Sequence, residues 1–182
     1  MAVTTFQDRW RLEEFLLAWD AGAFDKRAEL IDREIWAVPI SDWHDDIAGR
    51  VLRALPNDRY RVTTFTLPAG DSLLDPDCWV RREGTEPVDR LSPRLPRWSP
   101  DDVLLVVGVS DETLDHDLSS KATLYARTGY GCYWVVTRDG VYEHTEPSDA
   151  GYGRRVLYRP GDQIPVRHAG SSLAVSDLLR SG

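Results

Sequence analysis

The sequence is short of the features that define several common protein classes. Two cysteines among 182 residues are too few for a disulfide framework or an unaided zinc site, so we expect free buried thiols and a reducing cytoplasm. No window approaches about 18 apolar residues, and the N-terminal residues have no apolar signal core, so no membrane segment is expected. A glycine-rich phosphate loop, a nucleophile elbow and a dinucleotide fingerprint are all missing. Composition and motifs therefore do not support P-loop, serine-hydrolase or Rossmann classes.

Positive charge is also scarce. The formal net charge is −8 and the isoelectric point is near 5.0, which favours solubility and opposes non-specific binding to phosphate backbones. A local basic cleft can still coexist with an acidic exterior. Hydrophobic residues make up 42%, with seven tryptophans and seven tyrosines, as in a packed globular protein. The length predicts a single domain over residues 1–182.

The hydrophobic pattern predicts an α/β fold, in which a mixed β-sheet is flanked by helices. Helices are expected over residues 10–20, about 42–55 and 114–128, with Ser41 as an N-cap and Gly129 as a C-terminal stop. Strands are expected over residues 28–31, 34–38, 60–67, 74–80, 103–109, 132–137, 141–144, 155–158 and 163–167, and a small helix within 173–179. Asp139-Gly140 predicts a tight hairpin turn. The apolar residues around this turn motivate the hypothesis of a homodimer, which light scattering would test.

Residues 83–101 are predicted to form an irregular excursion. Four prolines interrupt this segment, and three arginines, Arg90, Arg94 and Arg97, make it the one locally basic stretch of note. A loop of this length within a domain is usually functional or mobile. Its arginines are candidates for phosphate contacts, and solvated side chains are the alternative.

Three pieces of sequence carry the chemistry. Asp75-Pro76-Asp77 enters one strand, Val106 to Ser110 forms the next, and Lys121 lies on the helix that follows. Phosphodiester hydrolysis needs a divalent cation that lowers the pKa of an attacking water, and hard cations prefer several oxygen ligands. A nearby lysine adds positive charge where negative charge develops.

These pieces resemble the Uma-type branch of the PD-(D/E)XK nuclease superfamily, a group of bacterial restriction-endonuclease-like proteins. The resemblance spans most of the chain and rests on an ordered set of fragments: Leu12 to Leu16, Glu29 to Asp32 with Glu34, His44 with Ile47 to Arg50, Asp75 to Asp77, Val109-Ser110, Asp117 with Lys121, Tyr125 to Gly129, and Tyr133 to Val136. It implies a restriction-endonuclease-like fold with a β-hairpin extension and Mg²⁺- or Mn²⁺-dependent hydrolysis of DNA. In that pattern Asp77 is the metal carboxylate, Lys121 the catalytic lysine and Glu29 an accessory acid.

The sequence departs from the family pattern at Gly108, where the family usually has glutamate. Glycine offers no side-chain ligand, so we expect weak activity or none. Asp111 or Glu112 would replace the missing carboxylate if the end of the strand bends back. Alternatively, Gly108 makes room for a different ligand, and the chain is a silent pseudoenzyme that binds a small molecule or a protein partner in the former cleft. A third hypothesis is a metal-independent enzyme acting on a small metabolite, with Lys121, Tyr125 or His44 as acid–base groups.

Each candidate also has a purely structural interpretation. Asp75-Pro76-Asp77 is ordinary turn chemistry, and Lys121 has Asp117 four residues earlier, a spacing that gives a surface ion pair contributing about 0.3–0.5 kcal/mol. Glu29 would be solvated at a strand end, His44 a surface histidine at a helix start, and Tyr125 a core residue. The sequence leaves these alternatives open.

Overall fold

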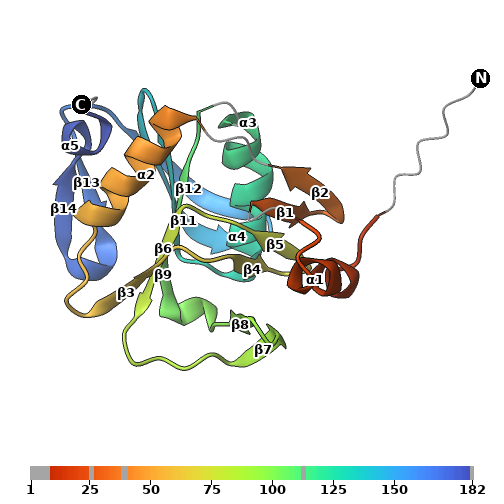
Figure 1. The fold of residues 1–182 in the computed structure, drawn as a ribbon. Coiled ribbons are helices and arrows are strands. Elements are labelled where there is room, and N and C mark those ends of the chain that lie inside the picture. Colours follow the sequence, from red (N-terminus) through yellow and green to blue (C-terminus); the bar gives the residue numbers. More distant parts are fainter. Residues whose placement is uncertain (1–8, 25–26, 38–40, 112–113, 181–182) are drawn as a thin grey trace, which may run out of the picture.

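The structure is a computed structural model that describes residues 9–24, 27–37, 41–111 and 114–180. Two β-sheets and several helices form layers (Figure 1). The helices are α1 (Leu12–Asp20), α2 (Asp42–Ala54), α3 (Leu114–His116), a π-helical turn (Asp117–Lys121), α4 (Ala122–Thr128) and α5 (Val175–Leu179). None of the described helices is long and apolar enough to cross a membrane.

The larger sheet has six strands in the order β12-β11-β10-β9-β6-β3. Its strands are β3 (Tyr60–Thr63), β6 (Cys78–Arg82), β9 (Val103–Val109), β10 (Cys132–Thr137), β11 (Gly140–Ser148) and β12 (Gly151–Tyr158). Strand β9 pairs in parallel with β10 and antiparallel with β6, so the predicted mixed sheet flanked by helices is confirmed. The apolar run of β9 reflects its central place, with neighbouring strands on both sides.

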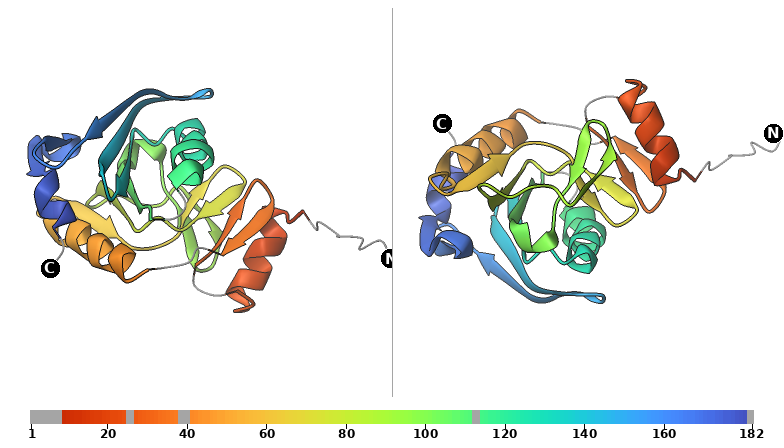
Figure 2. Two further views of the ribbon diagram at one scale, coloured as in Figure 1. Left: turned by 90° about the horizontal axis from the view of Figure 1, so that it is seen from above. Right: turned by 90° about the horizontal axis from the view of Figure 1, so that it is seen from below.

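The smaller sheet has four strands in the order β2-β1-β5-β4. They are β1 (Ala28–Ile31), β2 (Glu34–Ala37), β4 (Leu67–Ala69) and β5 (Ser72–Leu74). Two further strand pairs stand apart: β7 (Asp89–Ser92) with β8 (Leu95–Arg97), and β13 (Gln163–Val166) with β14 (Ser171–Ala174). Figure 2 shows α1 and the smaller sheet at one end of the molecule, and α5 with β13 and β14 at the other.

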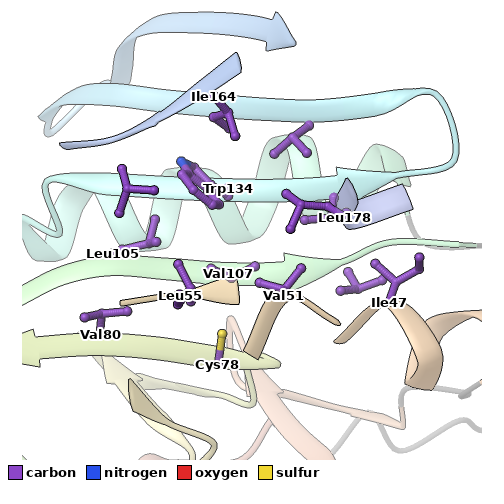
Figure 3. Close-up of a cluster of buried hydrophobic side chains, with 14 of the residues drawn as sticks. Ile47, Val51, Leu55, Cys78, Val80, Leu105, Val107, Trp134, Ile164 and Leu178 are labelled. Carbon is purple, nitrogen blue, oxygen red and sulfur yellow. The ribbon is translucent and has the colours of Figure 1, made fainter. Parts of the chain in front are cut away.

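The hydrophobic core has one cluster on each face of the larger sheet. On one face, α2 and α5 pack over alternate residues of β9 and β10, among them Val107 and Trp134 (Figure 3). On the other face, α4 and part of the smaller sheet pack over residues such as Val106 and Tyr133. A third cluster joins α1 to the smaller sheet. This arrangement brings the start of β1, the start of α2 and the π-helical turn to the region where β6 begins.

Several predicted elements have different bounds. Residues 83–101, expected to be irregular, contain the β7–β8 hairpin and a 3-10 turn (Pro100–Asp102), since edge strands tolerate proline. The predicted strands 60–67 and 74–80 each divide, and the second divides at Asp75-Pro76-Asp77. The predicted helix 114–128 contains the π-helical turn that carries Lys121.

The hairpin at Asp139-Gly140 is confirmed, joining β10 to β11. Gly140 is required there, because a Cβ would lie 2.3 Å from the carbonyl oxygen of Tyr158. Val141, next along, is fully buried in the core. The apolar part of this hairpin is therefore covered within the chain and gives no support to a homodimer.

Candidate functional site

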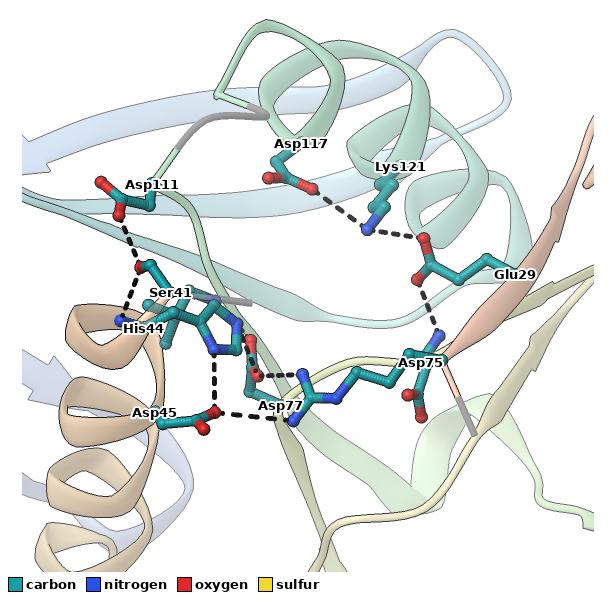
Figure 4. A network of polar contacts seen from close by, with 11 residues as sticks. Glu29, Ser41, His44, Asp45, Asp75, Asp77, Asp111, Asp117 and Lys121 are labelled. Carbon is teal, nitrogen blue, oxygen red and sulfur yellow. Dashed lines mark hydrogen bonds and ion pairs between the residues drawn. The ribbon is translucent and has the colours of Figure 1, made fainter. Parts of the chain in front are cut away.

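Asp77 lies at the centre of a polar network formed by loops and helix ends (Figure 4). It immediately precedes β6, and its backbone N–H donates to the carbonyl of Val107 on β9 at 3.0 Å. One carboxylate oxygen, Oδ2, accepts from the backbone N–H of Val109 at 2.6 Å. The other, Oδ1, lies 3.0 Å from Nε2 of His44 and 3.6 Å from a guanidinium nitrogen of Arg27. Both oxygens of the predicted metal ligand are thus engaged by donors of the protein itself.

His44 is buried, which corrects the interpretation of a surface histidine. Ser41 caps α2 as predicted and accepts the backbone N–H of His44, which turns the imidazole of the first helical turn toward the end of β9. Burial acts to lower the pKa of His44, but the hydrogen bond and the negative charge of Asp77 outweigh it and raise that pKa above its ordinary value of 6.5. His44 and Asp77 therefore form a charge-assisted pair.

Lys121 is enclosed between two carboxylates. Its Nζ lies 2.9 Å from Oε2 of Glu29 and 3.2 Å from Oδ1 of Asp117, and all three side chains are nearly inaccessible to solvent. Burial acts to lower the pKa of Lys121, while the charges of Glu29 and Asp117 raise it above its usual value. The predicted surface ion pair and the predicted solvated Glu29 are both wrong: this is a buried triad.

Glu29 also positions Asp75. Its Oε1 accepts the backbone N–H of Asp75 at 2.8 Å, which fixes the loop that leads to Asp77. Burial and the neighbouring charge of Glu29 raise the pKa of the Asp75 carboxyl to about 6. Asp75 is thus a carboxyl group that changes charge close to neutral pH.

Gly108 faces an aromatic neighbour. A Cβ at this position would lie 3.2 Å from the hydroxyl oxygen of Tyr133 on β10. Tyr133 and Tyr125 are both fully buried and stand edge to face, with their ring centroids 4.8 Å apart. Burial raises the pKa of each phenol well above its usual value, so neither is suited to exchange a proton at neutral pH.

Asp111 does not supply the carboxylate that position 108 lacks. Its carboxylate forms a two-pronged ion pair with Arg138 at 2.7 and 2.9 Å and accepts from the hydroxyl of Ser41 at 2.7 Å. It therefore holds the start of α2 against the β10–β11 turn and does not face Asp77. Glu112, the other candidate, lies outside the described residues.

Comparisons with known proteins identify the family and the fold of this chain. The model of the Uma2 family, described as "Putative restriction endonuclease", matches residues 12–176. The chain belongs to the Uma2 family. A solved structure described as a "putative nuclease belonging to DUF820", from Anabaena variabilis ATCC 29413, is similar in fold: the TM-score is 0.66 at 15% identity, and 93% of this chain and 97% of that chain are covered. No curated protein matches the sequence.

Restriction endonucleases commonly use a divalent metal, and whether such an ion fits this Uma2 protein depends on the side chains that its site offers. Within the described residues, no three acidic, histidine or cysteine side chains are placed to hold a metal ion together. Asp77 is paired with two cationic groups, Glu29 and Asp117 are paired with Lys121, and Gly108 supplies no ligand. The donor set as arranged does not fit a divalent cation, which needs several free oxygen ligands.

Three residues of the site were not predicted from the sequence. Arg27 contacts Asp77, Asp75 is the titrating carboxyl and Tyr133 fills the space beside Gly108. Asp75 could have been found by its place beside Asp77. Tyr133 lies two residues before Val135, which pairs with Gly108, so its contact depends on a strand register that only the fold supplies. Arg27 comes close through the packing of β1, and no local pattern indicates it.

Proposed function

We propose that this Uma2 protein binds nucleic acid in the family cleft and that its magnesium-dependent hydrolysis of DNA has been weakened or lost. The observation that carries the proposal is the state of Asp77. Its two oxygens are bound by His44, Arg27 and the backbone of Val109. A metal at this carboxylate would have to displace these partners, and the two cationic groups oppose its approach.

The rest of the site supports the same conclusion. Mg²⁺ loses its water reluctantly and is usually held by one or two carboxylates with near-octahedral geometry. The second carboxylate is replaced at Gly108, and Asp111 is committed to Arg138. Lys121 is neutralised by Glu29 and Asp117, so its charge is not free to act on a phosphate.

A cavity beside the site supports retained binding. It has a volume of about 590 Å³ and is lined by Asp75, Asp77 and Arg27 together with Trp19, Phe65 and Arg94. Aromatic rings offer faces to bases, and arginines offer charge to phosphates. This cavity therefore offers both kinds of contact beside Asp77.

Calorimetric titration with Mg²⁺ and Mn²⁺ tests the proposal, together with cleavage of supercoiled plasmid DNA. The proteins to compare are wild type, Asp77→Ala and Gly108→Glu. We expect no heat of metal binding and no cleavage above background for wild type. Metal binding by wild type that disappears in Asp77→Ala, with cleavage to match, would overturn the proposal.

A second candidate is a metal-independent enzyme that acts on a small anionic metabolite. The specific observation is a titrating carboxyl beside a histidine–carboxylate pair: Asp75 with a pKa of about 6, next to Asp77 and His44. Of the acid–base groups predicted earlier, His44 alone remains suited, because Lys121 is doubly paired and Tyr125 is fully buried. A thermal-shift screen of nucleotides and phosphorylated metabolites in EDTA tests it, since a ligand that stabilises wild type but not Asp75→Asn would favour this candidate.

A further inference from the structure

A second cavity continues from the one beside the site. It has a volume of about 410 Å³ and lies over β3, β6 and the β7–β8 hairpin. The two cavities share Phe65, Thr66 and Arg94 in their linings, so together they form one continuous groove. At the tip of the hairpin, Arg94 lies over the ring of Trp19 on α1, with 5.0 Å between the guanidinium carbon and the ring centroid. Figure 2 shows this hairpin extending on the side of the molecule that faces α1.

Like charges are placed opposite one another in this groove. Arg61 on β3 pairs directly with Arg81 on β6 in the antiparallel register, and both line the second cavity. Burial lowers the pKa of Arg81, and the charge of Arg61 lowers it further, while Glu83, Glu86 and Asp102 act in the opposite sense. Like charges directly across two strands are destabilising. An arrangement that costs stability in the free protein becomes favourable once an anion lies between the two guanidinium groups.

Among the described residues, three of the four arginines that line the second cavity have no acidic partner, whereas Glu83, Glu86 and Asp102 act on the fourth, Arg81. In the part of the chain that the structure describes, no acidic side chain forms an ion pair with Arg61, Arg90 or Arg94, and the described lining of the second cavity contains no acidic residue. By contrast, Arg97 on the same hairpin pairs with Asp89. The second cavity is therefore a local basic surface on a chain of net charge −8, which points to a polyanionic ligand.

Aromatic rings alternate with these arginines. The guanidinium carbon of Arg81 lies 4.0 Å from the ring centroid of Trp98. Phe65, where the two cavities meet, keeps 36% of its surface exposed. Its ring stands edge to face with Trp19 at 6.0 Å. Phe65 is thus an exposed ring among cations, and Trp98 is a partly buried ring with Arg81 against it. A ring and cations side by side match the requirements of a strand whose phosphates and base faces are both accessible.

We propose that this surface, the arginine–tryptophan groove (Arg61, Arg81, Arg90, Arg94, Phe65 and Trp98), binds an extended single strand of nucleic acid. The phosphates lie against the arginines, and the bases stack on the exposed ring of Phe65 and on the accessible part of Trp98. A single strand fits better than a duplex, because a duplex hides the base faces that Phe65 and Trp98 would contact. The inference rests on the nucleic-acid part of the proposed function and is independent of any metal at Asp77.

Fluorescence anisotropy in EDTA tests the groove. The probes are a labelled 20-nucleotide oligo-dT and a labelled 20-base-pair duplex, titrated with wild type, Arg61→Glu, Phe65→Ala and Arg154→Glu. Arg154→Glu is the matched control, because Arg154 is exposed on β12 at the opposite edge of the same sheet and its replacement changes net charge as Arg61→Glu does. A glutamate at position 61 would face Arg81 and form an ion pair, so this variant keeps the fold. Thermal melting confirms folding for each.

We expect wild type to bind oligo-dT at least tenfold more tightly than the duplex. Arg61→Glu and Phe65→Ala should each weaken oligo-dT binding about tenfold or more, and Arg154→Glu less than twofold. The slope of log K against log salt concentration should fall in magnitude by about 0.7 in Arg61→Glu, for one lost phosphate contact on a single strand.

Three results would overturn the inference: no oligo-dT binding, equal or tighter binding of the duplex, or equal losses in Arg61→Glu and Arg154→Glu. Displacement of oligo-dT by poly-glutamate at equal charge concentration would also overturn the inference. It would indicate that the groove binds an acidic protein segment. Loss of oligo-dT binding with duplex binding retained would overturn the groove alone, and loss of both would also overturn nucleic-acid binding by the protein. Metal titration and plasmid cleavage decide separately whether hydrolysis is lost.

Discussion

The hydroxyl oxygen of Tyr133 lies 3.2 Å from the point that a Cβ at position 108 would occupy. Tyr133 is fully buried and packs against Tyr125, so its ring has little freedom to withdraw. The glycine and the tyrosine are therefore coupled: the phenol partly fills the space that a side chain at position 108 would need.

This coupling predicts that Gly108→Glu alone restores a metal site poorly. We expect the variant to lose about 1–3 kcal/mol of unfolding free energy through overpacking. The double variant Gly108→Glu/Tyr133→Phe removes the phenolic oxygen and should bind Mn²⁺ more tightly than the single variant. Urea denaturation and calorimetry measure the two effects.

Gly131→Glu is the matched control for this pair of variants. Gly131 is exposed, and a Cβ there meets nothing within 4 Å. It adds the same charge away from the site, so it should neither bind Mn²⁺ nor lose more than about 0.5 kcal/mol of stability. Equal Mn²⁺ binding by Gly108→Glu with and without Tyr133→Phe would show that the tyrosine is no obstacle.

Removal of the Lys121 charge should destabilise the fold. Lys121→Met leaves Glu29 and Asp117 buried without their shared cation, and breaking a buried pair costs about 3–5 kcal/mol. Adding Glu29→Gln to Lys121→Met should recover part of that loss. Urea denaturation at pH 7 measures both.

The exposed pair Arg11–Glu14 offers a control for Lys121. Both side chains are largely open to solvent, so Glu14→Gln should leave the free energy of unfolding almost unchanged. A loss below about 1 kcal/mol for Lys121→Met would contradict the buried triad.

The raised pKa of Asp75 predicts that the free energy of unfolding depends on pH. Its pKa of about 6 in the folded chain exceeds the ordinary 3.8, so the folded state holds this proton more tightly than the unfolded state. This contribution makes stability fall as the pH rises from about 4 through 6. Asp75→Asn should be more stable than wild type at pH 8, by about 1–2 kcal/mol after allowance for partial exposure, and this advantage should vanish below pH 4. A difference independent of pH would contradict the raised pKa.

The raised pKa of His44 predicts a second loss of stability, at higher pH. Its raised pKa means that the protonated ring contributes stability that is fully present below 6.5 and is lost as the pH rises through the folded value. NMR titration of the imidazole should give a pKa above 6.5. In Asp77→Asn the pKa should fall below 6.5, because burial then outweighs the remaining contacts. A pKa unchanged by Asp77→Asn would contradict the pair.

The sequence predicted correctly the elements that are determined by a few neighbouring residues. The apolar run 103–109, the cap at Ser41 and the turn at Asp139-Gly140 all lie as expected, because propensity, capping and turn chemistry act over a few residues. The hairpin in 83–101 was not predicted, because its prolines suggested irregular structure, whereas edge strands admit them.

In the candidate site, too, the sequence predicted some features, and others depend on the fold. Asp77, Lys121 and Glu29, the residues chosen from the sequence, lie near one another: Lys121 contacts Glu29, and Glu29 holds the loop that leads to Asp77. Their pairing could not be foreseen. The His44–Asp77 contact joins residues 33 positions apart in sequence, and the burial that makes both pairs strong exists only in the packed fold.

One measurement tests the central claim, that Asp77 is engaged by His44 and Arg27 and holds no divalent metal. The chain has four histidines, so their imidazole signals can be followed individually by NMR as Mn²⁺ is added. A Mn²⁺ ion bound to Asp77 would lie within a few ångströms of His44, whose Nε2 is 3.0 Å from the carboxylate, and would broaden its signal first. The account predicts that His44 broadens no more than His168, which packs on Tyr60. Selective broadening of His44 at low Mn²⁺, abolished in Asp77→Asn, would contradict it.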